Sequence, residues 1–325
     1  MTVSTPVELI VAAPGRKSRG LAQAIARRIG IAVIVIWGAI TASFLALKSM
    51  GGDPVQSIAG GVVQVTPELR EQIIAKYGLD DSFFQQYLSY LGGVLQGDLG
   101  TSYALRRPVV DAIAEQLPNT MTLLITATVF AVAVAFIVSL TTAHRGKRVR
   151  SIFQALESIG VAVPAFWLGI MLITIFSFGL RMFPSTGANG VAALVLPSIA
   201  LGLPVAATLS QVMRDTLEKT LDEPFIVTVR ARGAGEFVVR VRHALRHSLV
   251  SVITLVGWLS GTLIGGAVVV EQVFSRPGIG RMIFSAVLNK DMPVVLGIVI
   301  VAAVFYVIVN TVIDLLYPII DPRLR

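Results

Sequence analysis

Six stretches of this chain are apolar enough, and long enough, to cross a lipid bilayer. An α-helix rises about 1.5 Å per residue, so about 20 residues cross a hydrocarbon core of about 30 Å. A membrane β-barrel would instead show short alternating segments of about ten residues. The pattern therefore predicts an all-α polytopic membrane protein with six transmembrane helices. The six apolar runs are Ile29 to Leu47, Met121 to Ala143, Ile159 to Leu180, Leu196 to Met213, Val250 to Val270 and Val294 to Leu316.

Positively charged residues indicate the orientation of these helices. Lys and Arg concentrate before the first run, between the second and third runs and at the end of the chain, whereas the loop after the third run holds only Arg181. Short loops rich in Lys and Arg stay in the cytoplasm, so we expect both termini on the cytoplasmic side of a plasma membrane. The first run is longer than the apolar part of a signal peptide, which favours an uncleaved anchor over a cleaved signal.

Four regions follow from this pattern of spans and loops. Residues 1–28 are expected to form a cytoplasmic segment and residues 29–50 the first transmembrane helix. Residues 51–117 form a long external segment. Residues 118–325 supply a five-helix membrane core, which is interrupted by the polar segment 222–247.

The external segment carries the signals of two amphipathic helices. Thr66-Pro67-Glu68 offers a capping hydroxyl, a proline at the first helical position and an acid near the positive helix end. Gly78 supplies a stop. A second helix is predicted from about Ser82 to Gln96, with its apolar residues on one side. These helices either pack on the outer mouth of the bundle or help to form a platform for a protein that delivers solute.

Composition excludes several classes of function. The chain is 54% hydrophobic and 14% charged, whereas soluble domains average about 25% charged residues. The net charge of +8 follows from basic residues at the ends of spans, so we expect no nucleic-acid partner. The sequence has no Cys and three His, so we expect no metal site. It has no phosphate-binding loop and no nucleophile motif, so we expect no catalytic residues.

The polar segment Asp222 to His247 lies where a short loop would suffice to join the fourth and fifth runs. It cannot cross hydrocarbon, because unpaired polar groups there cost several kcal/mol each. Pro224 favours a short helix that begins there, and Gly233 and Gly235 end it and turn the chain back. Val238 to Arg246 is predicted to be an amphipathic, basic stretch at the membrane interface. In the short helix we expect capping by Asp222 or Glu223, an apolar face of Phe225, Ile226 and Val229, and polar contacts from Arg230 and Arg232.

An ordered set of motifs gives this chain a family resemblance. Arg230-Ala231-Arg232-Gly233 and the following His243-Ala244-Leu245 look like the cytoplasmic coupling segment of an importer permease of the ATP-binding cassette (ABC) class. The whole set resembles the first permease subunit of the peptide/nickel type. Further matching motifs are Gly97 to Ser102, Leu117 to Thr120, Val163 to Gly169, Gln211 to Arg214, Gly266 to Phe274, Pro277 to Gly280 and the ending Asp321 to Arg325.

The resemblance implies a type I ABC importer permease fold and a set of partners. It implies a second homologous permease subunit, two cytoplasmic ATP-binding subunits or domains and an external solute-binding protein, all within or at the membrane lipid. It implies no cofactor in this chain, since ATP and Mg²⁺ are bound by the ATPase partners. Coupling to the ATPase would fall to Glu223, Phe225, Thr228, Arg230, Ala231, Arg232 and Gly233.

Three polar residues within the apolar runs are candidates for a gate or pathway. Glu271 lies near the outer end of the fifth run, where we expect it to shape the outer gate. Asn310 and Asp314 share a face of the last helix because they are four residues apart. They either line part of the solute path or serve packing, with Asp314 paired to a cytoplasmic Arg.

Glycine and proline positions add two expectations about packing. Pro164 and Pro204 can kink their helices by freeing a carbonyl group. Small residues on one stripe permit close helix packing. This stripe, in the fifth run, consists of Gly257, Gly261, Gly265 and Gly266.

Other functions stay open at this point. Peptides are the first expectation for cargo, and nickel, glutathione, haem or another small solute are alternatives. A secondary carrier driven by an ion gradient would need an inverted repeat and ionisable groups near the midplane, and neither is clear in the sequence. A membrane assembly protein without transport would explain the hydrophobicity but not the polar segment 222–247.

Overall fold

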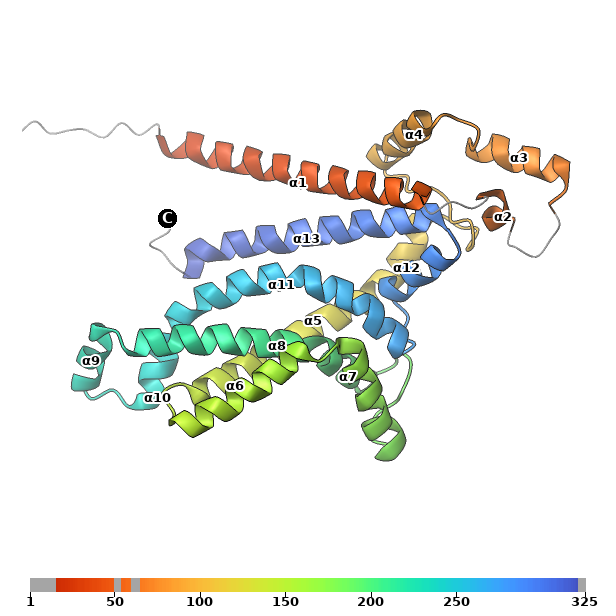
Figure 1. Cartoon of the computed structure of the whole chain (residues 1–325). Coiled ribbons are helices and arrows are strands. Elements are labelled where there is room, and N and C mark those ends of the chain that lie inside the picture. The colour runs from red at the N-terminus through yellow and green to blue at the C-terminus, as the bar shows by residue number, and fades with distance from the viewer. Residues whose placement is uncertain (1–15, 50–53, 60–64, 321–325) are drawn as a thin grey trace, which may run out of the picture.

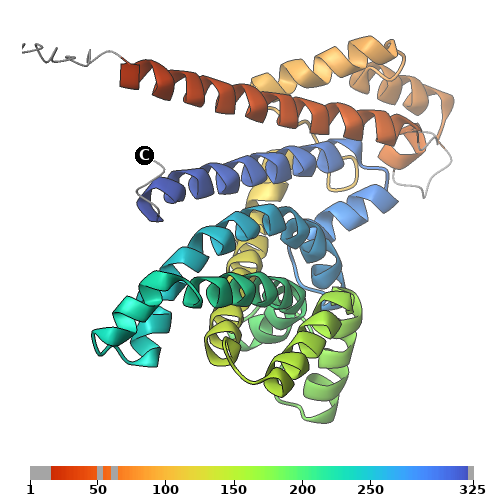
Figure 2. The ribbon, with the colours of Figure 1, turned by 60° about the vertical axis from the view of Figure 1, so that its left-hand side comes forward.

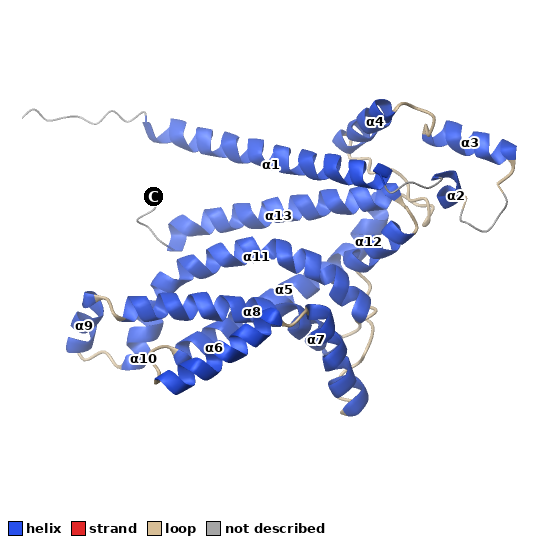
Figure 3. Cartoon of the chain, viewed as in Figure 1, coloured by secondary structure: helices blue, strands red, loops and turns tan. Residues whose placement is uncertain are grey.

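The computed structural model describes residues 16–49, 54–59 and 65–320. Helices are the only regular elements of these residues, and most are joined by short loops (Figures 1 and 3). An isolated β-bridge pairs Thr101 with Pro108. The elements are α1 (Arg16–Ser49), α2 (Pro54–Ile58), α3 (Pro67–Tyr77), α4 (Phe83–Leu95), α5 (Val109–Thr142), α6 (Lys147–Ala162), α7 (Ala165–Leu172), the π-helix η1 (Ile173–Gly179), α8 (Ala192–Leu221), α9 (Pro224–Ala231), α10 (Glu236–Val238), the π-helix η2 (Val239–Ala244), α11 (Leu245–Val273), α12 (Ile279–Leu288) and α13 (Met292–Ile320).

Five of the six predicted spans are confirmed as long apolar helices. They are α1, α5, α8, α11 with the preceding α10 and η2, and α13. Each helix is longer than the apolar run that predicted it, because helical turns with polar residues extend it beyond the expected membrane boundary. The polar stretch at Val238 to Arg246 is therefore not a separate interfacial helix. It is the first part of the fifth span, which runs without a break from Glu236 to Val273.

The third predicted span, Ile159 to Leu180, is wrong as a single helix. The chain bends by 101° between α6 and the pair α7–η1. Pro164 causes the break, because it has no N–H to donate and because a residue that precedes proline, here Val163, disfavours the helical region. Val163 has an extended backbone, with ψ at 121°. Pro204, by contrast, lies within a continuous α8.

Helix α8 forms the centre of the bundle. It packs against α5 and α11 most extensively, and also against α6 and α7. Gly202 permits the approach to α5, since a Cβ at this position would lie 2.7 Å from the carbonyl oxygen of Ala127. The main hydrophobic core joins the buried faces of α5, α8 and α11. Its members include Leu123, Ala127, Leu196, Ala200, Leu201, Leu209, Met213, Leu259, Leu263 and Phe274.

Helix α1 lies at the edge of the molecule beside α13, as the red and blue ribbons of Figures 1 and 2 show. An ion pair of 3.2 Å joins Arg28 of α1 to Asp314 of α13. Most of the apolar side chains described in α1 face away from the protein, for example Trp37, which is 53% exposed. This is the pattern of a helix that contacts lipid on one side.

Helices α3 and α4 lie where the sequence predicted two amphipathic helices. The Thr66 hydroxyl accepts a hydrogen bond from the N–H of Leu69, and Gly78 ends α3 in the left-handed region with φ at 59°. Ser82 and Gln85 form a reciprocal capping box at the start of α4. Both predicted helices are therefore confirmed.

The segment between α1 and α5 is fixed to the bundle by polar contacts. The buried carboxylate of Asp291, just before α13, accepts hydrogen bonds from the Ser102 hydroxyl and from the N–H groups of Tyr103 and Ala104. On α4, Tyr87 shares a 2.6 Å hydrogen bond with Thr41 of α1.

The glycine stripe of α11 serves packing within the chain at three of its four positions. A Cβ at Gly257 would lie 2.7 Å from Ile313 on α13, and one at Gly261 would contact Tyr306 of the same helix. Gly266 faces α8. Gly265 alone has open space beside it.

Candidate functional site

The short helix α9 and the chain that follows it form a hairpin at one end of the molecule, here named the α9 end (Figure 1). The opposite end holds α12, α3 and α4. Helix α9 begins at Pro224 as predicted. Glu223 occupies the capping position, but its side chain accepts no hydrogen bond from the helix. The hairpin turns at Gly233, where φ is 83°, a left-handed value that favours glycine.

An apolar cluster anchors the hairpin to the ends of the long helices. Ile226, the central member on α9, is completely buried. It packs with residues from the end of α5, the end of α8 and the π-helix η2. Any displacement of α9 must therefore displace these helices or break the cluster. The buried members are Ala143, Leu217, Leu221, Ile226, Val239 and Ala244, and Leu140, Val229 and Ala234 pack against them.

Ion pairs and hydrogen bonds tie the hairpin to neighbouring loops. Asp222 lies 3.3 Å from His144 in the turn after α5. The Arg240 guanidinium donates to the carbonyl oxygen of Leu140 at 3.1 Å. Arg230 binds Glu236 across the hairpin, with 2.8 Å between Nε and Oε1. Arg230, which was expected to project as a polar contact, thus has a partner within the chain.

The remaining face of the hairpin carries exposed apolar side chains. Phe225 is 39% exposed, Val227 65% and Phe237 75%. Arg232 is exposed beside them. An apolar tip with a cationic neighbour on a rigidly anchored helix is suited to contact another protein. Of the residues predicted for coupling, Glu223, Phe225, Thr228, Ala231, Arg232 and Gly233 lie on the exposed surface and Arg230 at its edge.

A buried ion pair joins α6 to α8, and of its two residues only Arg214 stood in a motif noted in the sequence. Arg214 of α8 and Glu157 of α6 are joined by two hydrogen bonds of 2.7 Å each. Their side chains are 2% and 5% exposed. The two residues are 57 positions apart, and α6 packs alongside α8. This ion pair therefore holds α6, the first half of the bent span, against α8.

Glu271, the first gate candidate, is completely buried near the α12 end. Its Oε1 accepts a 2.6 Å hydrogen bond from the Thr120 hydroxyl of α5, and its Oε2 accepts one from the N–H of Arg281 in α12. A Cβ at Gly278 would lie 2.3 Å from the carboxylate. The carboxylate therefore joins three elements, α5, α11 and α12. Its role in a gate stays a prediction.

Arg276 lies buried in the turn between α11 and α12. Burial lowers the pKa of its guanidinium, and the nearby charge of Glu271 opposes that shift. Its Nη2 donates to the carbonyl oxygen of Asn119 in α5 at 3.4 Å. The buried charges of Arg276 and Glu271 therefore lie close together at the turn between α11 and α12.

Asn310 and Asp314 lie on the side of α13 that faces other helices. Asp314 pairs with an Arg, Arg28, as expected, and the cytoplasmic location of this pair stays a prediction. The Asn310 amide donates to the carbonyl oxygen of Tyr306 in its own helix. A pathway role for either residue stays a prediction. Among the residues described, no three His, Asp or Glu side chains gather as a metal site would require.

The chain has clear relatives among characterised families. Residues 131–325 match the family described as binding-protein-dependent transport system inner membrane component, and residues 21–124 match the N-terminal region of such components. A putative peptide transport system permease protein of Brucella abortus is 36% identical over 310 residues, which cover 93% of this chain and 98% of the relative.

Two further relatives and one solved structure extend the comparison. The oligopeptide transport system permease protein AppB of Bacillus subtilis is 34% identical, with 94% of this chain and 100% of AppB covered. The glutathione transport system permease protein GsiC of Salmonella typhi is 36% identical, with 87% and 92% covered. The inward-facing MetNI methionine ABC transporter superposes with a TM-score of 0.52 at 18% identity, over 66% of this chain and 96% of that chain. This likeness concerns the fold alone.

Proposed function

We propose that this chain, which belongs to the family of binding-protein-dependent transport system inner membrane components, is the permease subunit of an ATP-driven peptide importer. The family membership confirms the resemblance found in the sequence and makes the chain a multi-pass membrane permease. Peptide cargo is supported by the names of the Brucella and Bacillus relatives. The similarity to GsiC favours glutathione, itself a peptide, as the second candidate. An ion-gradient carrier gains no support from these relatives.

The observation that carries the proposal is the exposed apolar tip on an anchored α9. In this role α9 inserts into a cytoplasmic ATPase, with Phe225 as the apolar contact and Arg232 as the polar one. Ile226 fixes the other face of α9 to α8 and η2. A movement of the ATPase would therefore be transmitted as a rigid-body displacement of the bundle. Coupling requires that ATP and the delivered solute favour different states of this bundle.

The partners complete the proposal. A second permease of similar fold would close the path, and two ATP-binding subunits would hold ATP and Mg²⁺. An external binding protein would deliver the cargo near α3 and α4. This arrangement requires the α9 end and both termini on the cytoplasmic side. The turn between α5 and α6 contains Arg145, and α6 begins with Lys147 and Arg148; these basic residues support this orientation.

Uptake into proteoliposomes tests the function. The full assembly, reconstituted with its binding protein, is expected to take up labelled di- and oligopeptides with ATP consumption that vanadate inhibits. Glutathione, nickel and haem serve as competing cargoes. Uptake of nickel or haem without peptide uptake would contradict the proposed cargo. Crosslinks from Phe225→Cys to an external protein rather than to the ATPase would contradict the proposed coupling.

A further inference from the structure

Helix α4, at the α12 end, presents three different faces. One face packs on α1, where the rings of Phe83 and Tyr87 meet Phe44 edge to face. A second face is polar and exposed, with Gln85 and Ser89. The third face is an apolar row at helical spacing. This row, here named the α4 stripe, consists of Phe84, Leu88, Leu91 and Leu95.

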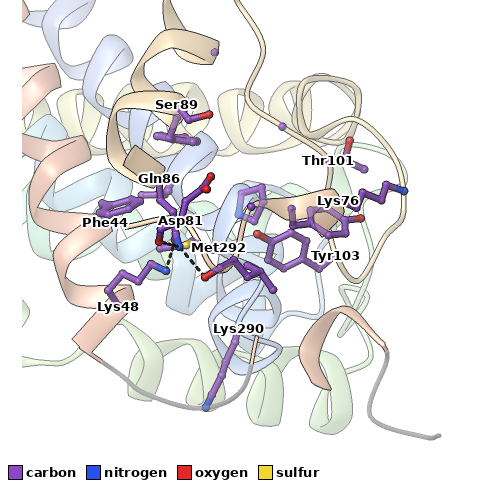
Figure 4. Close-up of a pocket in the computed structure, with 18 of the residues that line it drawn as sticks. Phe44, Lys48, Lys76, Asp81, Gln86, Ser89, Thr101, Tyr103, Lys290 and Met292 are labelled. Carbon is purple, nitrogen blue, oxygen red and sulfur yellow. Dashed lines mark hydrogen bonds between the residues drawn. The ribbon is translucent and has the colours of Figure 1, made fainter. Parts of the chain in front are cut away.

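The α4 stripe is largely uncovered in the part of the chain that the structure describes. Phe84, Leu88 and Leu95 are exposed, and Leu91 is half-buried. None of the four lines the cavity of about 820 Å³ beside α4, whereas Ser89 does (Figure 4). An exposed apolar row marks contact with another protein or with a membrane. The position of α4 decides between the two.

Contacts with α1 fix the depth of α4 relative to the membrane. Tyr87 shares its hydrogen bond with Thr41, and the apolar span of α1 continues beyond Thr41 to Ala46. This contact therefore lies about 7.5 Å inside the end of the span, at 1.5 Å per residue. Just beyond the span, Lys48 donates to the side-chain oxygen of Gln86 (Figure 4). Helix α4 thus straddles the level at which hydrocarbon gives way to headgroups.

The same contacts indicate which side of α4 is the deeper one. Gln86 meets Lys48 outside the apolar span. Tyr87, about 100° farther around the helix, meets Thr41 inside the span. A further step of about 100° in the same direction reaches Leu88. The α4 stripe therefore lies on the side of α4 that is turned toward the hydrocarbon.

The composition of α4 favours lipid over a water-soluble protein as the occupant of this face. Helix α4 contains no Lys, Arg, Asp or Glu, whereas α3 carries acidic and basic residues. Charges give a protein-docking surface its specificity and speed of association, and α4 offers none. Its two tyrosines, Tyr87 and Tyr90, are typical of the membrane interface, because each has an apolar ring and a polar hydroxyl.

We propose that α4 is an interfacial helix whose stripe inserts among the acyl chains of the lipid leaflet at the α12 end. Gln85 and Ser89 then face headgroups and water. Interfacial helices bury their apolar face by about 5–10 Å, a depth that matches the contact between Tyr87 and Thr41. Of the two roles expected for this helix, packing on the bundle or a docking platform, the second then falls to α3. The inference requires only that α1 spans the membrane, so it holds for any cargo.

Single spin labels in the full chain test this placement. The sequence has no Cys, so Leu88→Cys and Ser89→Cys each provide one attachment point for a nitroxide. The two positions are adjacent and both exposed, but they lie on different faces of α4. Ile34→Cys, at an exposed position within the span of α1, is the lipid reference, and Gln72→Cys, at an exposed position of α3, is the water reference.

The measurement is the collision rate of each label with two relaxing agents in nanodiscs, molecular oxygen and a neutral, water-soluble nickel chelate. Oxygen concentrates in hydrocarbon, whereas the chelate would lose its hydrogen bonds to water there. We expect the ratio of oxygen to chelate collisions to be about tenfold higher at Leu88 than at Ser89. The ratio at Leu88 should approach that at Ile34, and the ratio at Ser89 that at Gln72. A thermal melting curve in detergent checks that each labelled chain is folded.

Three results would overturn the proposal. Equal ratios at Leu88 and Ser89, both close to the water reference, would place the stripe in water. Low collision rates with both agents at Leu88 would show that protein covers it. The measurement is repeated with the complete transport assembly, and a loss of oxygen collisions at Leu88 in the assembly alone would assign the stripe to a partner subunit.

Discussion

The turn at Gly233 gives a prediction that separates backbone strain from steric bulk. Gly233 has φ at 83°, and a Cβ added there would meet no atom within 4 Å. Gly235, two residues later, has equally open surroundings but φ at −68°. Replacing each glycine by alanine therefore adds the same methyl group to free space, and only Gly233→Ala forces an L-residue into the left-handed region.

The magnitude follows from that single difference. An L-residue in the left-handed region costs about 1–2 kcal/mol. This free energy changes an equilibrium by a factor of about 5 to 30. The population of the correctly placed hairpin should fall by that factor relative to displaced forms. We expect Gly233→Ala to lower peptide uptake by up to this amount while ATP hydrolysis continues, and Gly235→Ala to stay close to the parent.

The assay is the ratio of ATP hydrolysed to peptide imported, measured in proteoliposomes that hold the complete assembly. Gly233→Asn provides a further arm, because asparagine tolerates the left-handed region better than other non-glycine residues. It should recover part of the uptake lost in Gly233→Ala. If Gly233→Ala and Gly235→Ala show the same ratio, the left-handed turn does not position α9, and the reasoning from φ is wrong.

Three further variants test the packing of the bundle. Glu157→Ala should lower the stability of the detergent-solubilised chain by about 3–5 kcal/mol, because it leaves the buried Arg214 without its partner, and exchanging the two residues should restore part of the melting temperature. Gly202→Val should cost about 1–3 kcal/mol through overpacking against α5, measurable by the same melting curve. Glu271→Gln should retain the fold but lose one of the two hydrogen bonds to the carboxylate, which should lower stability by about 1–3 kcal/mol. If uptake is unchanged in that variant, the negative charge of Glu271 has no role in a gate.

Local signals in the sequence predicted the elements well, since each acts within a few residues. Thr66 caps α3 as expected, α4 begins close to the predicted Ser82, and Pro224 begins α9. The break at Pro164 was readable as a possible kink, but not as a bend of 101°. The size of the bend depends on tertiary contacts, among them Gly169, where a Cβ would lie 3.1 Å from Phe274.

The candidate site was only partly predictable, because its anchors come from distant parts of the chain. The position of α9 and its glycine turn could be read from spacing alone. The ion pair between Arg230 and Glu236 was missed, although the residues are only six apart, because the fold of the hairpin decides whether they meet. The partner of Glu271 is Thr120, 151 positions earlier. No local pattern links residues so far apart.

Two continuous helices connect the α9 hairpin with the far end of the molecule. Helix α8 ends at the hairpin, and the fifth span starts from it and runs for 38 residues, or about 57 Å at 1.5 Å per residue. Both helices meet in the main core, so a shift of the hairpin must move them together. At the far end Glu271 binds the last turns of α11 to α5 and α12. We therefore expect movement at α9 to reach the turn between α11 and α12 through α11, and to carry α7 with it, because α7 packs against both α8 and α11.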